Sequence, residues 1–325
     1  MVGLVRSLRS AAMVLAALVL VPCVVTLVLR QVAVDTRWPV AYVAASPYVL
    51  GAAGLALILF VLARAWLGAA VALVTGLVLA TTQLPLYVAD AAPAADGTRT
   101  VVMTANLRFG LADAQAVVDI VRERNVDLLM LQELTPEAQD ALRVAGVDEV
   151  LPHSTSTPLG GVSGNGLWSR TPLEPLLQPN GFGNPPVAAT IELAGHEVFL
   201  ATIHAVSPFP GDAERWSDEL GQLASWLDAS DGPAIVAGDL NATFDHRQFR
   251  DLLETGLRDA VEQSGSGHVP TFPVGRRYSP LISIDHALTR GPIVATRVDT
   301  AELGGTDHLA LLAELSIAPS RLATG

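Results

Sequence analysis

The chain contains no lysine and only one cysteine among its 325 residues. The single cysteine, Cys23, excludes a structural disulfide within the chain and says little about the compartment in which the protein works. Charge is also missing from two long stretches near the N-terminus. Residues 11–29 carry none, and Arg64 is the one charged residue between 39 and 88. Together with a mean hydropathy of +0.42, high for a soluble protein, this pattern indicates a membrane region followed by one good-sized domain.

The uncharged stretches predict three transmembrane helices at residues 11–29, 42–62 and 67–88, because about 20 apolar residues cross a bilayer. A cleaved signal peptide is the alternative for the first stretch, but it would not explain the two later ones. Three arginines would then lie on one side of the membrane and two on the other: Arg6, Arg9 and Arg64 against Arg30 and Arg37. Because positively charged residues are enriched on the cytoplasmic side of a membrane, the excess of one arginine favours the side with Arg6, Arg9 and Arg64 as cytoplasmic. It predicts a multi-pass protein of the cell membrane with everything after residue 90 extracytoplasmic.

The chain therefore divides into a membrane anchor with three transmembrane helices (1–90), a small, Pro-containing linker (91–98) and one domain (99–318). Charge is split across this division. Residues 1–97 carry a net charge of +2, whereas the remainder has fifteen arginines against twenty-nine acidic residues, a net charge of −14. An acidic domain repels a polyanion, so nucleic acid is a disfavoured partner unless a basic patch at Arg276 and Arg277 overrides this. A phosphorylated small molecule or a lipid-linked substrate is easier to accept.

The domain mixes strand-like and helix-like segments. We expect strands at 100–107, 126–131, 164–169, 187–193, 197–204, 233–237, 282–288 and 309–315, and helices at 113–123, 136–144, 212–227 and 246–254. Asp113 is available as a helix N-cap, and Ala194-Gly195 predicts a hairpin turn. Strands interspersed with helices, some joined by hairpins, indicate an α/β domain with a mixed sheet.

Five short strings place a metal ligand or proton carrier at the end of an apolar, strand-like run. They are Thr104-Ala105-Asn106, Leu131-Gln132-Glu133, Thr202-Ile203-His204, Gly238-Asp239-Leu240-Asn241 and Thr306-Asp307-His308. Strand ends are positions where a rigid sheet can hold such side chains close together. Carboxylates, amides and imidazoles without a cysteine describe a site for a hard divalent cation and an oxyanion such as phosphate.

Three of these strings have a simpler explanation when they are taken alone. Glu133 follows a buried run and is either a compensated buried carboxylate or a helix cap. A two-residue period would place Asp239 and Asn241 on one face of a strand, although an Asx turn is the common alternative. His204 at the end of a strand is more often a core or edge residue than a catalyst.

A second group of candidates lies near the C-terminus. Asp285 follows an apolar run, and the pair Asp307-His308 follows a glycine turn. A carboxylate hydrogen-bonded to an imidazole fixes the tautomer and raises the basicity of the ring. We interpret the remaining histidines in polar or turn contexts as surface residues, namely His153, His196, His246 and His268.

Taken together and in this order, the five strings resemble the endonuclease/exonuclease/phosphatase superfamily, the DNase I-like proteins, over residues 99–316. The resemblance implies a four-layer α/β sandwich of two mixed β-sheets flanked by helices, here preceded by the three transmembrane helices. It also implies a phosphohydrolase or phosphodiesterase that depends on Mg²⁺ or Mn²⁺.

The resemblance also implies residue roles. Asn106, Glu133 and Asp307 would form the metal site, with Glu133 as the main ligand. His204, Asp239, Asn241, Asp285 and His308 would be catalytic: Asp239 orients the attacking water, Asn241 and His204 contact phosphate, and Asp285 pairs with the acid–base residue His308. Thr306 and His286 depart mildly from the usual pattern, and the short segment 151–164 lacks room for long DNA-gripping inserts.

The three predicted spans before such a domain resemble the membrane-anchored actinobacterial members of this superfamily, the VanJ-like proteins. That likeness rests on architecture and on the lysine-free, alanine-rich composition. It implies an extracytoplasmic hydrolase of a phosphoric ester or anhydride, acting on a lipid-linked or small phosphorylated substrate. A surface endonuclease or phospholipid phosphodiesterase and a non-catalytic membrane sensor or scaffold are the alternatives. The sequence specifies neither the metal, the leaving group nor the oligomeric state.

Overall fold

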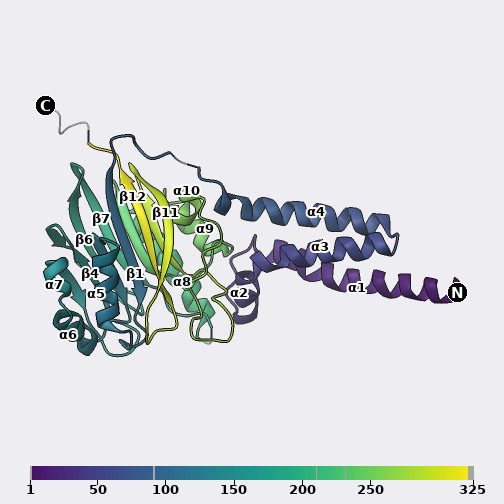
Figure 1. Cartoon of the computed structure of the whole chain (residues 1–325), viewed down its shortest axis with the longest axis horizontal. Helices are drawn as coiled ribbons and strands as arrows, with labels where there is room; N and C mark the ends of the chain where they lie inside the picture. Colours follow the sequence, from purple (N-terminus) through teal and green to yellow (C-terminus); the bar gives the residue numbers. More distant parts are fainter. Residues whose placement is uncertain (1, 91, 210, 231, 321–325) are drawn as a thin grey trace.

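A computed structural model describes residues 2–90, 92–209, 211–230 and 232–320. Apolar helices project from one side of an α/β domain (Figure 1). These helices are α1 (Val2–Leu29), α2 (Arg37–Ala44), α3 (Ser46–Leu62) and α4 (Trp66–Gln83), followed by the 3-10 helix η1 (Leu84–Tyr87). The chain then enters the domain. Residue 91, in the expected linker, lies outside the described residues.

Two six-stranded sheets form the centre of the domain. The first has the order β11-β12-β1-β2-β4-β3, and the second has the order β5-β6-β7-β8-β10-β9. The strands of the first sheet are β1 (Thr98–Asn106), β2 (Leu128–Gln132), β3 (His153–Thr157), β4 (Asn165–Ser169), β11 (Ile293–Glu302) and β12 (Leu309–Ile317). Those of the second are β5 (Leu173–Pro175), β6 (Val187–Leu193), β7 (His196–His204), β8 (Ala234–Asp239), β9 (Arg258–Asp259) and β10 (Asp285–Arg290). Each sheet is mixed, because β1–β2 and β7–β8 are parallel while the other pairs are antiparallel.

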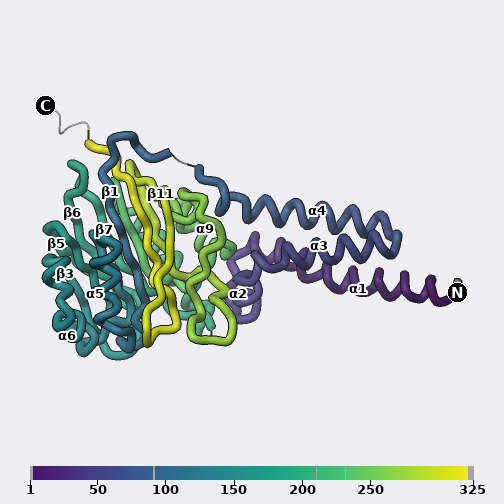
Figure 2. Tube along the Cα trace, viewed as in Figure 1, coloured from purple at the N-terminus to yellow at the C-terminus, as the bar shows by residue number. Residues whose placement is uncertain are grey.

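Helices flank the two sheets, as the path of the chain in Figure 2 shows. They are α5 (Ala114–Glu123), α6 (Pro136–Val144), α7 (Val147–Val150), α8 (Ala213–Asp228), α9 (Arg247–Leu253) and α10 (Ala260–Ser264). Helices α5 to α7 share an apolar core with β1 and β2, and α8 and α9 share another with β7 and β8. A third core lies between the two sheets. The predicted four-layer α/β sandwich is therefore confirmed.

Local chemistry explains the helices that the sequence predicted well. The carboxylate of Asp113 accepts hydrogen bonds from two backbone N–H groups of the first turn of α5, as expected of an N-cap. Helix α8 buries one apolar face, made of Trp216, Leu220, Leu223 and Leu227. The two-residue turn at Ala194-Gly195 joins β6 to β7, and both residues have positive φ.

Other elements were missed or misplaced. Strands β3 and β11 were not expected, because their alternation of polar and apolar residues is weak and their burial is only partial. Strand β10 begins at Asp285 rather than at residue 282, since Ile282 forms an isolated bridge with Phe272 instead. These shifts move the candidate residue Asp285 to the first position of its strand.

The prediction of three transmembrane helices needs correction. Two helices are long and apolar enough to cross a membrane, at Gly3–Leu29 and Trp66–Tyr87. The middle segment is a pair, α2 and α3, bent by 70°, and it would be a third span only if the pair counts as one. The break has a local cause: Pro47 at the start of α3 lacks an N–H and disfavours helical backbone before it. Val40 and Val43 of α2 instead bury themselves in the domain core.

A buried polar junction ties the N-terminal helices to the domain. Arg30, just after α1, donates from Nε to Asp245 Oδ1 over 2.7 Å, and Gln83 at the end of α4 donates to the same oxygen over 2.8 Å. Arg250 of α9 donates to the backbone carbonyls of Asp245 and Arg30. Burial raises the pKa of Asp245, and the hydrogen bond and charge of Arg30 oppose that rise. The ends of α1 and α4, far apart in sequence, thus both bind the domain loop that contains Asp245.

This junction predicts that Arg30→Met destabilises the chain by about 3 kcal/mol or more, because removing one partner leaves a buried carboxylate uncompensated. Thermal unfolding of the full chain in detergent measures the effect. Arg64→Met is the matched control, since Arg64 is exposed between α3 and α4. Equal unfolding temperatures for the two variants would show that the junction contributes no stability.

Candidate active site

The two sheets bring the predicted site residues to one edge of the sandwich. Asn106, His204 and Asp239 are the last residues of β1, β7 and β8, and Glu133 directly follows β2. His308 directly precedes β12. These five residues, together with Asn241 and Asp307, line one pocket of about 500 Å³. Asp285 is buried behind it and reaches the pocket through His308.

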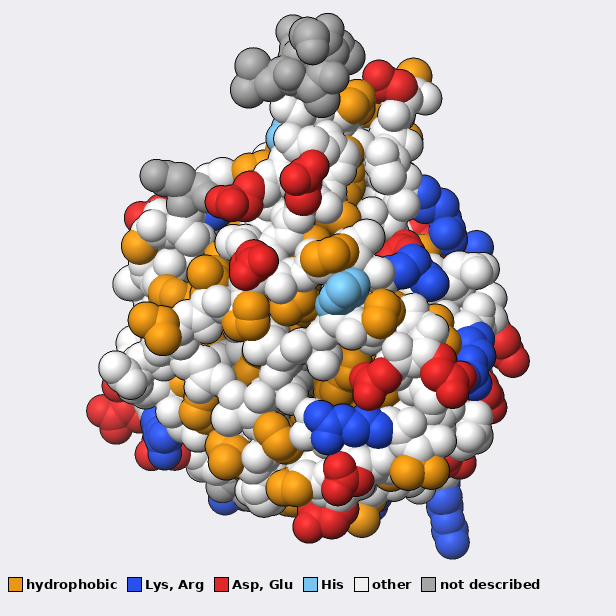
Figure 3. Space-filling view, turned by 90° about the vertical axis from the view of Figure 1, so that its left-hand side faces the viewer, with side chains coloured by type: hydrophobic (Ala, Val, Ile, Leu, Met, Phe, Trp, Pro, Cys, Tyr) orange, Lys and Arg blue, Asp and Glu red, His pale blue; other side chains and the backbone are white. Residues whose placement is uncertain are grey.

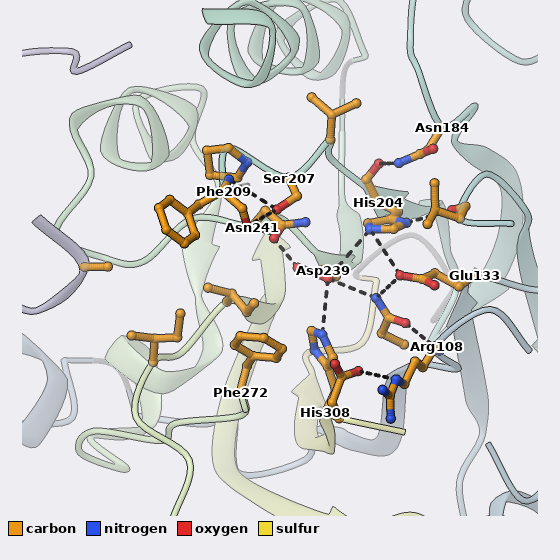
Figure 4. A pocket seen from close by; sticks show the side chains of 18 of the residues that line it. Arg108, Glu133, Asn184, His204, Ser207, Phe209, Asp239, Asn241, Phe272 and His308 are labelled. Carbon is orange, nitrogen blue, oxygen red and sulfur yellow. Dashed lines mark hydrogen bonds and ion pairs between the residues drawn. The ribbon is translucent and has the colours of Figure 1, made fainter. Parts of the chain in front are cut away.

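Asp239 lies at the centre of this arrangement (Figure 4). Its Oδ2 is 3.0 Å from Asn106 Nδ2, 3.7 Å from His204 Nε2 and 3.8 Å from His308 Nε2. Burial raises the pKa of Asp239, and the nearby charge of Asp285 raises it further, while His308 and His204 oppose the rise. One oxygen of the Asp239 carboxylate therefore faces an amide N–H and two imidazole nitrogens.

The backbone conformation around Asp239 depends on the neighbouring residues Gly238 and Asn241. Gly238 has φ 154°, and a Cβ at this position would lie 1.9 Å from the carbonyl oxygen of Ile203, so no other residue fits. Asp239 Oδ1 accepts from Asn241 N, as in an Asx turn. Asn241 has left-handed backbone (φ 48°), and its Nδ2 donates to Ala205 O. Both side chains line the pocket because of this turn. The expectation that strand periodicity would align them was wrong, since β8 ends at Asp239.

His308 and Asp285 form a buried hydrogen-bonded pair. Nδ1 of His308 is 2.9 Å from Asp285 Oδ2, and the ring of Phe272 packs on the imidazole with centroids 4.8 Å apart. Burial alone would lower the pKa of His308, but the charge and hydrogen bond of Asp285, with Asp239 and Asp307, raise it to about 9. The ring is therefore protonated at neutral pH, with Nε2–H directed at Asp239. The carboxylate-supported imidazole expected from the sequence is present.

His204 is oriented by backbone groups. Its Nδ1 lies 3.0 Å from the carbonyl oxygen of Val162, which can only accept, so Nδ1 carries a proton. Asn184 Nδ2 donates to the backbone carbonyl of His204 over 3.1 Å. Nε2 is then left facing Asp239 and Glu133, at 3.7 Å and 3.9 Å. His204 is thus a pocket residue with one ring nitrogen available to a ligand.

The three predicted metal ligands all line the pocket, and each has protein partners. Asn106 Nδ2 donates to Glu133 Oε1 over 3.0 Å as well as to Asp239. Glu133 Oε2 accepts from Phe109 N over 2.6 Å, and Glu133 has an unusual left-handed φ of 55°. Asp307 is partly exposed and lies 3.7 Å from Arg108 Nε. Their oxygen donors suit a hard divalent cation.

The arrangement fits a cation electrostatically. Glu133 and Asp239 both accept hydrogen bonds from the same amide nitrogen of Asn106, so two nearly buried carboxylates lie close together. A divalent ion would offset their repulsion. Within the described chain, the closest cluster of acidic and imidazole ligand atoms is a different one: Asp239, Asp285 and His308, all within 4.8 Å of one another. The assignment of Asn106, Glu133 and Asp307 as ligands accordingly stays a prediction.

The structure adds pocket residues that sequence reasoning missed. Arg108 and Asn184 line the pocket beside the predicted residues, and Phe272 forms the wall next to His308. Three residues of α2 also line it, although α2 precedes the domain by more than fifty positions. Only the position of Arg108, two residues after Asn106, could have drawn attention to it.

The interpretation of His246 as a surface residue was wrong. It is buried, its Nε2 is 3.0 Å from the carbonyl oxygen of Val40 in α2, and burial lowers its pKa to about 4. His286 is also buried and pairs with Asp259 over 2.8 Å. Unlike His204, neither His246 nor His286 has a ring nitrogen available to a ligand, because both nitrogens of each ring have protein partners.

Comparison with known proteins agrees with this geometry. The sequence profile of the Endonuclease/Exonuclease/phosphatase family matches residues 103–308, which span all five strings. The chain belongs to this family. None of the curated proteins compared with it matches.

Solved structures show the same fold at low sequence identity. D. rerio TDP2, solved with a single-stranded DNA product, is 17% identical with a TM-score of 0.55, and the match covers 67% of this chain and 99% of that one. An endonuclease/exonuclease/phosphatase from Beutenbergia cavernae is 21% identical with a TM-score of 0.52, covering 68% and 72%. A family member from Bacteroides thetaiotaomicron is 16% identical with a TM-score of 0.52, covering 69% and 99%. Each match covers about two thirds of this chain, a share close to that of the α/β domain.

The pair formed by His308 and Asp285 predicts a pH-dependent contribution to stability. The folded pKa of His308, about 9, exceeds its ordinary value of 6.5. The stabilisation is therefore complete below pH 6.5 and disappears as the pH rises through 9. Asp285→Asn should lower the unfolding temperature clearly at pH 6 and much less at pH 10, measured with EDTA present. A deficit that is constant across this range would contradict the charged pair.

Proposed function

We propose that the protein is a membrane-anchored, divalent-metal-dependent hydrolase of phosphoric esters or anhydrides. Its substrate is a phosphorylated small molecule or a lipid-linked phosphate. The observation that carries this proposal is the position of Asp239, whose Oδ2 faces Asn106, His204 and His308 in one pocket. Family membership and the oxygen-rich pocket support the same class of reaction.

In this mechanism Asp239 accepts a hydrogen bond from a water and directs its oxygen toward phosphorus. The new phosphorus–oxygen bond forms in line with the bond to the leaving oxygen, which breaks. The proton lost by the water passes to Asp239, and the leaving oxygen departs with the bonding electrons and takes up a proton from solvent. His308, protonated and held by Asp285, donates a proton or a hydrogen bond to the phosphoryl group as charge develops. His204 Nε2 and the amide of Asn241 contact the remaining phosphoryl oxygens.

We assign the metal to Glu133, with Asn106 and Asp307 as the other ligands. Bound there, Mg²⁺ or Mn²⁺ would neutralise negative charge on the phosphoryl oxygens and on the leaving group. The hydrogen bonds from Phe109 N and Asn106 Nδ2 hold the Glu133 carboxylate in place. Arg108 holds Asp307 at the rim of the pocket.

The N-terminal helices support membrane anchoring in this proposal. Two are long and apolar enough to span a bilayer, and their ends are fastened to the domain through Asp245. The arginine distribution favours an extracytoplasmic catalytic domain. We therefore retain the division into an anchor (1–90), a linker (91–98) and a hydrolase domain (99–318) as part of the proposal, with α2 of the anchor packed on the domain.

A surface endonuclease or phospholipid phosphodiesterase is the second candidate. The DNA product in the D. rerio TDP2 structure favours it, because that protein has the same fold. The net charge of −14 beyond residue 97 opposes a polyanionic substrate. On the face of the domain turned away from the helices, acidic and basic side chains are interspersed and do not gather into one basic field (Figure 3). A non-catalytic sensor or scaffold explains the sequence less well, because such a protein would not need to keep all five strings.

A substrate panel on the full chain in detergent tests the reaction. Plasmid DNA, a sphingomyelin-like lipid and a polyprenyl pyrophosphate are offered with Mg²⁺. We expect hydrolysis of the pyrophosphate, and we expect Asp239→Ala, Glu133→Ala and His308→Ala each to lower turnover by about a thousandfold or more. Asp218→Ala, an exposed site on α8, is the control. Unchanged turnover in folded Asp239→Ala would refute the assignment of Asp239.

Metal removal provides a separate test. EDTA should abolish turnover, and Mg²⁺ or Mn²⁺ should restore it. Glu133→Asp should need a higher metal concentration for half-maximal activity than the wild type, because the shorter side chain draws the carboxylate away from the other ligands. Activity that survives exhaustive chelation would contradict a metal-dependent mechanism.

A further inference from the structure

Helix α2 is part of the pocket wall. Val40, Ala41 and Ala44 line the same pocket as Asp239 and His308. In Figure 1, α2 lies where the long apolar helices meet the domain. The side chain of Val40 is buried in the domain core, whereas Ala41 and Ala44 are only partly covered. The N-terminal region therefore builds a part of the pocket wall, although it lies outside residues 103–308 that match the family.

The elbow formed by α2 and the start of α3 (residues 37–48) also holds two pocket loops. The guanidinium of Arg37 lies over the ring of Phe209 at 4.1 Å, and Trp38 packs edge-on against that ring at 5.7 Å. On the other side, the hydroxyl of Tyr48 donates to the carbonyl of Leu281 over 2.6 Å. The loops that contribute Phe209 and Ile282 to the pocket are therefore positioned by the elbow.

The pocket has two chemically different halves. Carboxylates, amides and imidazoles lie at one end. Phe209 and Phe272 lie on the side of Asp239 away from Glu133 and Arg108 (Figure 4), and the other apolar lining residues are Val206, Ile282, Ile284 and those of α2. Phe272 packs directly on His308, so the apolar half begins beside the catalytic imidazole. A phosphoryl group held by the polar half would place its leaving group or remaining substituent against an apolar surface.

We propose that the elbow is a substrate-binding element that receives the hydrocarbon chain of a phosphate-bearing lipid. This inference rests on the proposed function and selects the lipid-linked substrate over the small water-soluble one. Burial of a chain against α2 removes apolar surface from water. The small side chains of Ala41 and Ala44 leave room for the chain. Because the elbow connects directly to the apolar helices, a lipid can enter the pocket from the membrane side.

The test compares two ligands that share a phosphate and differ in the chain: hexadecyl phosphate and methyl phosphate. Binding to the full chain in nanodiscs is measured, together with turnover of the corresponding pyrophosphates. We expect Ala41→Trp and Ala44→Leu to weaken binding of hexadecyl phosphate about tenfold or more, with the affinity for methyl phosphate unchanged. Ala70→Trp is the matched control, since Ala70 lies exposed on α4.

The possible outcomes separate this inference from the proposed function. Selective loss of hexadecyl phosphate binding in the variants supports the inference, even if neither pyrophosphate is hydrolysed. The absence of hydrolysis would count against the proposed function. Hydrolysis by the wild type with equal affinity for both phosphates overturns the inference and leaves the proposed function standing. An equal loss of affinity for hexadecyl phosphate and methyl phosphate, in Ala41→Trp and in the milder Ala44→Leu, also overturns the inference. The substitutions would then disturb the site that binds the phosphoryl group and not a site for the hydrocarbon chain.

Discussion

Burial of the Asp239 carboxylate is the constraint on which the site depends. It lies at the end of a strand in the second sheet, and its hydrogen-bond partner Asn106 ends a strand in the first. A buried carboxylate is costly unless donors or positive charge surround it. Asn106, the backbone N–H of Asn241, His204 and His308 do so here, and they come from four different parts of the chain. The apolar core between the sheets brings these parts together.

The same site is connected to the apolar N-terminal helices through one short loop. Asn241 lies at its start, and Asp245 and His246 lie at its end. Arg30 and Gln83 bind Asp245, while His246 contacts the carbonyl of Val40 in α2. The N-terminal helices are therefore part of the structure around the site. They are packed against the loop that follows the central carboxylate, and they complete the wall of its pocket.

Much of the domain was predictable because its signals are local. The N-cap Asp113, the amphipathic face of α8 and the turn at Ala194-Gly195 each depend on a few adjacent residues. Weakly patterned strands such as β3 and β11 were missed, because backbone pairing with the next strand along the chain holds each of them, and a partly buried polar sequence shows little of that pairing. His246 was misjudged for a similar reason: a polar local context cannot reveal that a helix two hundred residues earlier covers it.

The sequence alone determined the family of the domain and the candidate site residues, because strand ends that carry Asn, Glu, His and Asp can be recognised residue by residue. It also determined that the N-terminal region is apolar enough for a membrane. The tertiary structure decided which groups meet: Asp285 behind His308, Arg108 on Asp307, and α2 against the pocket. It also decided where α2 lies after the break at Pro47, because burial of Val40 and Val43 in the domain is a long-range contact that hydropathy does not encode.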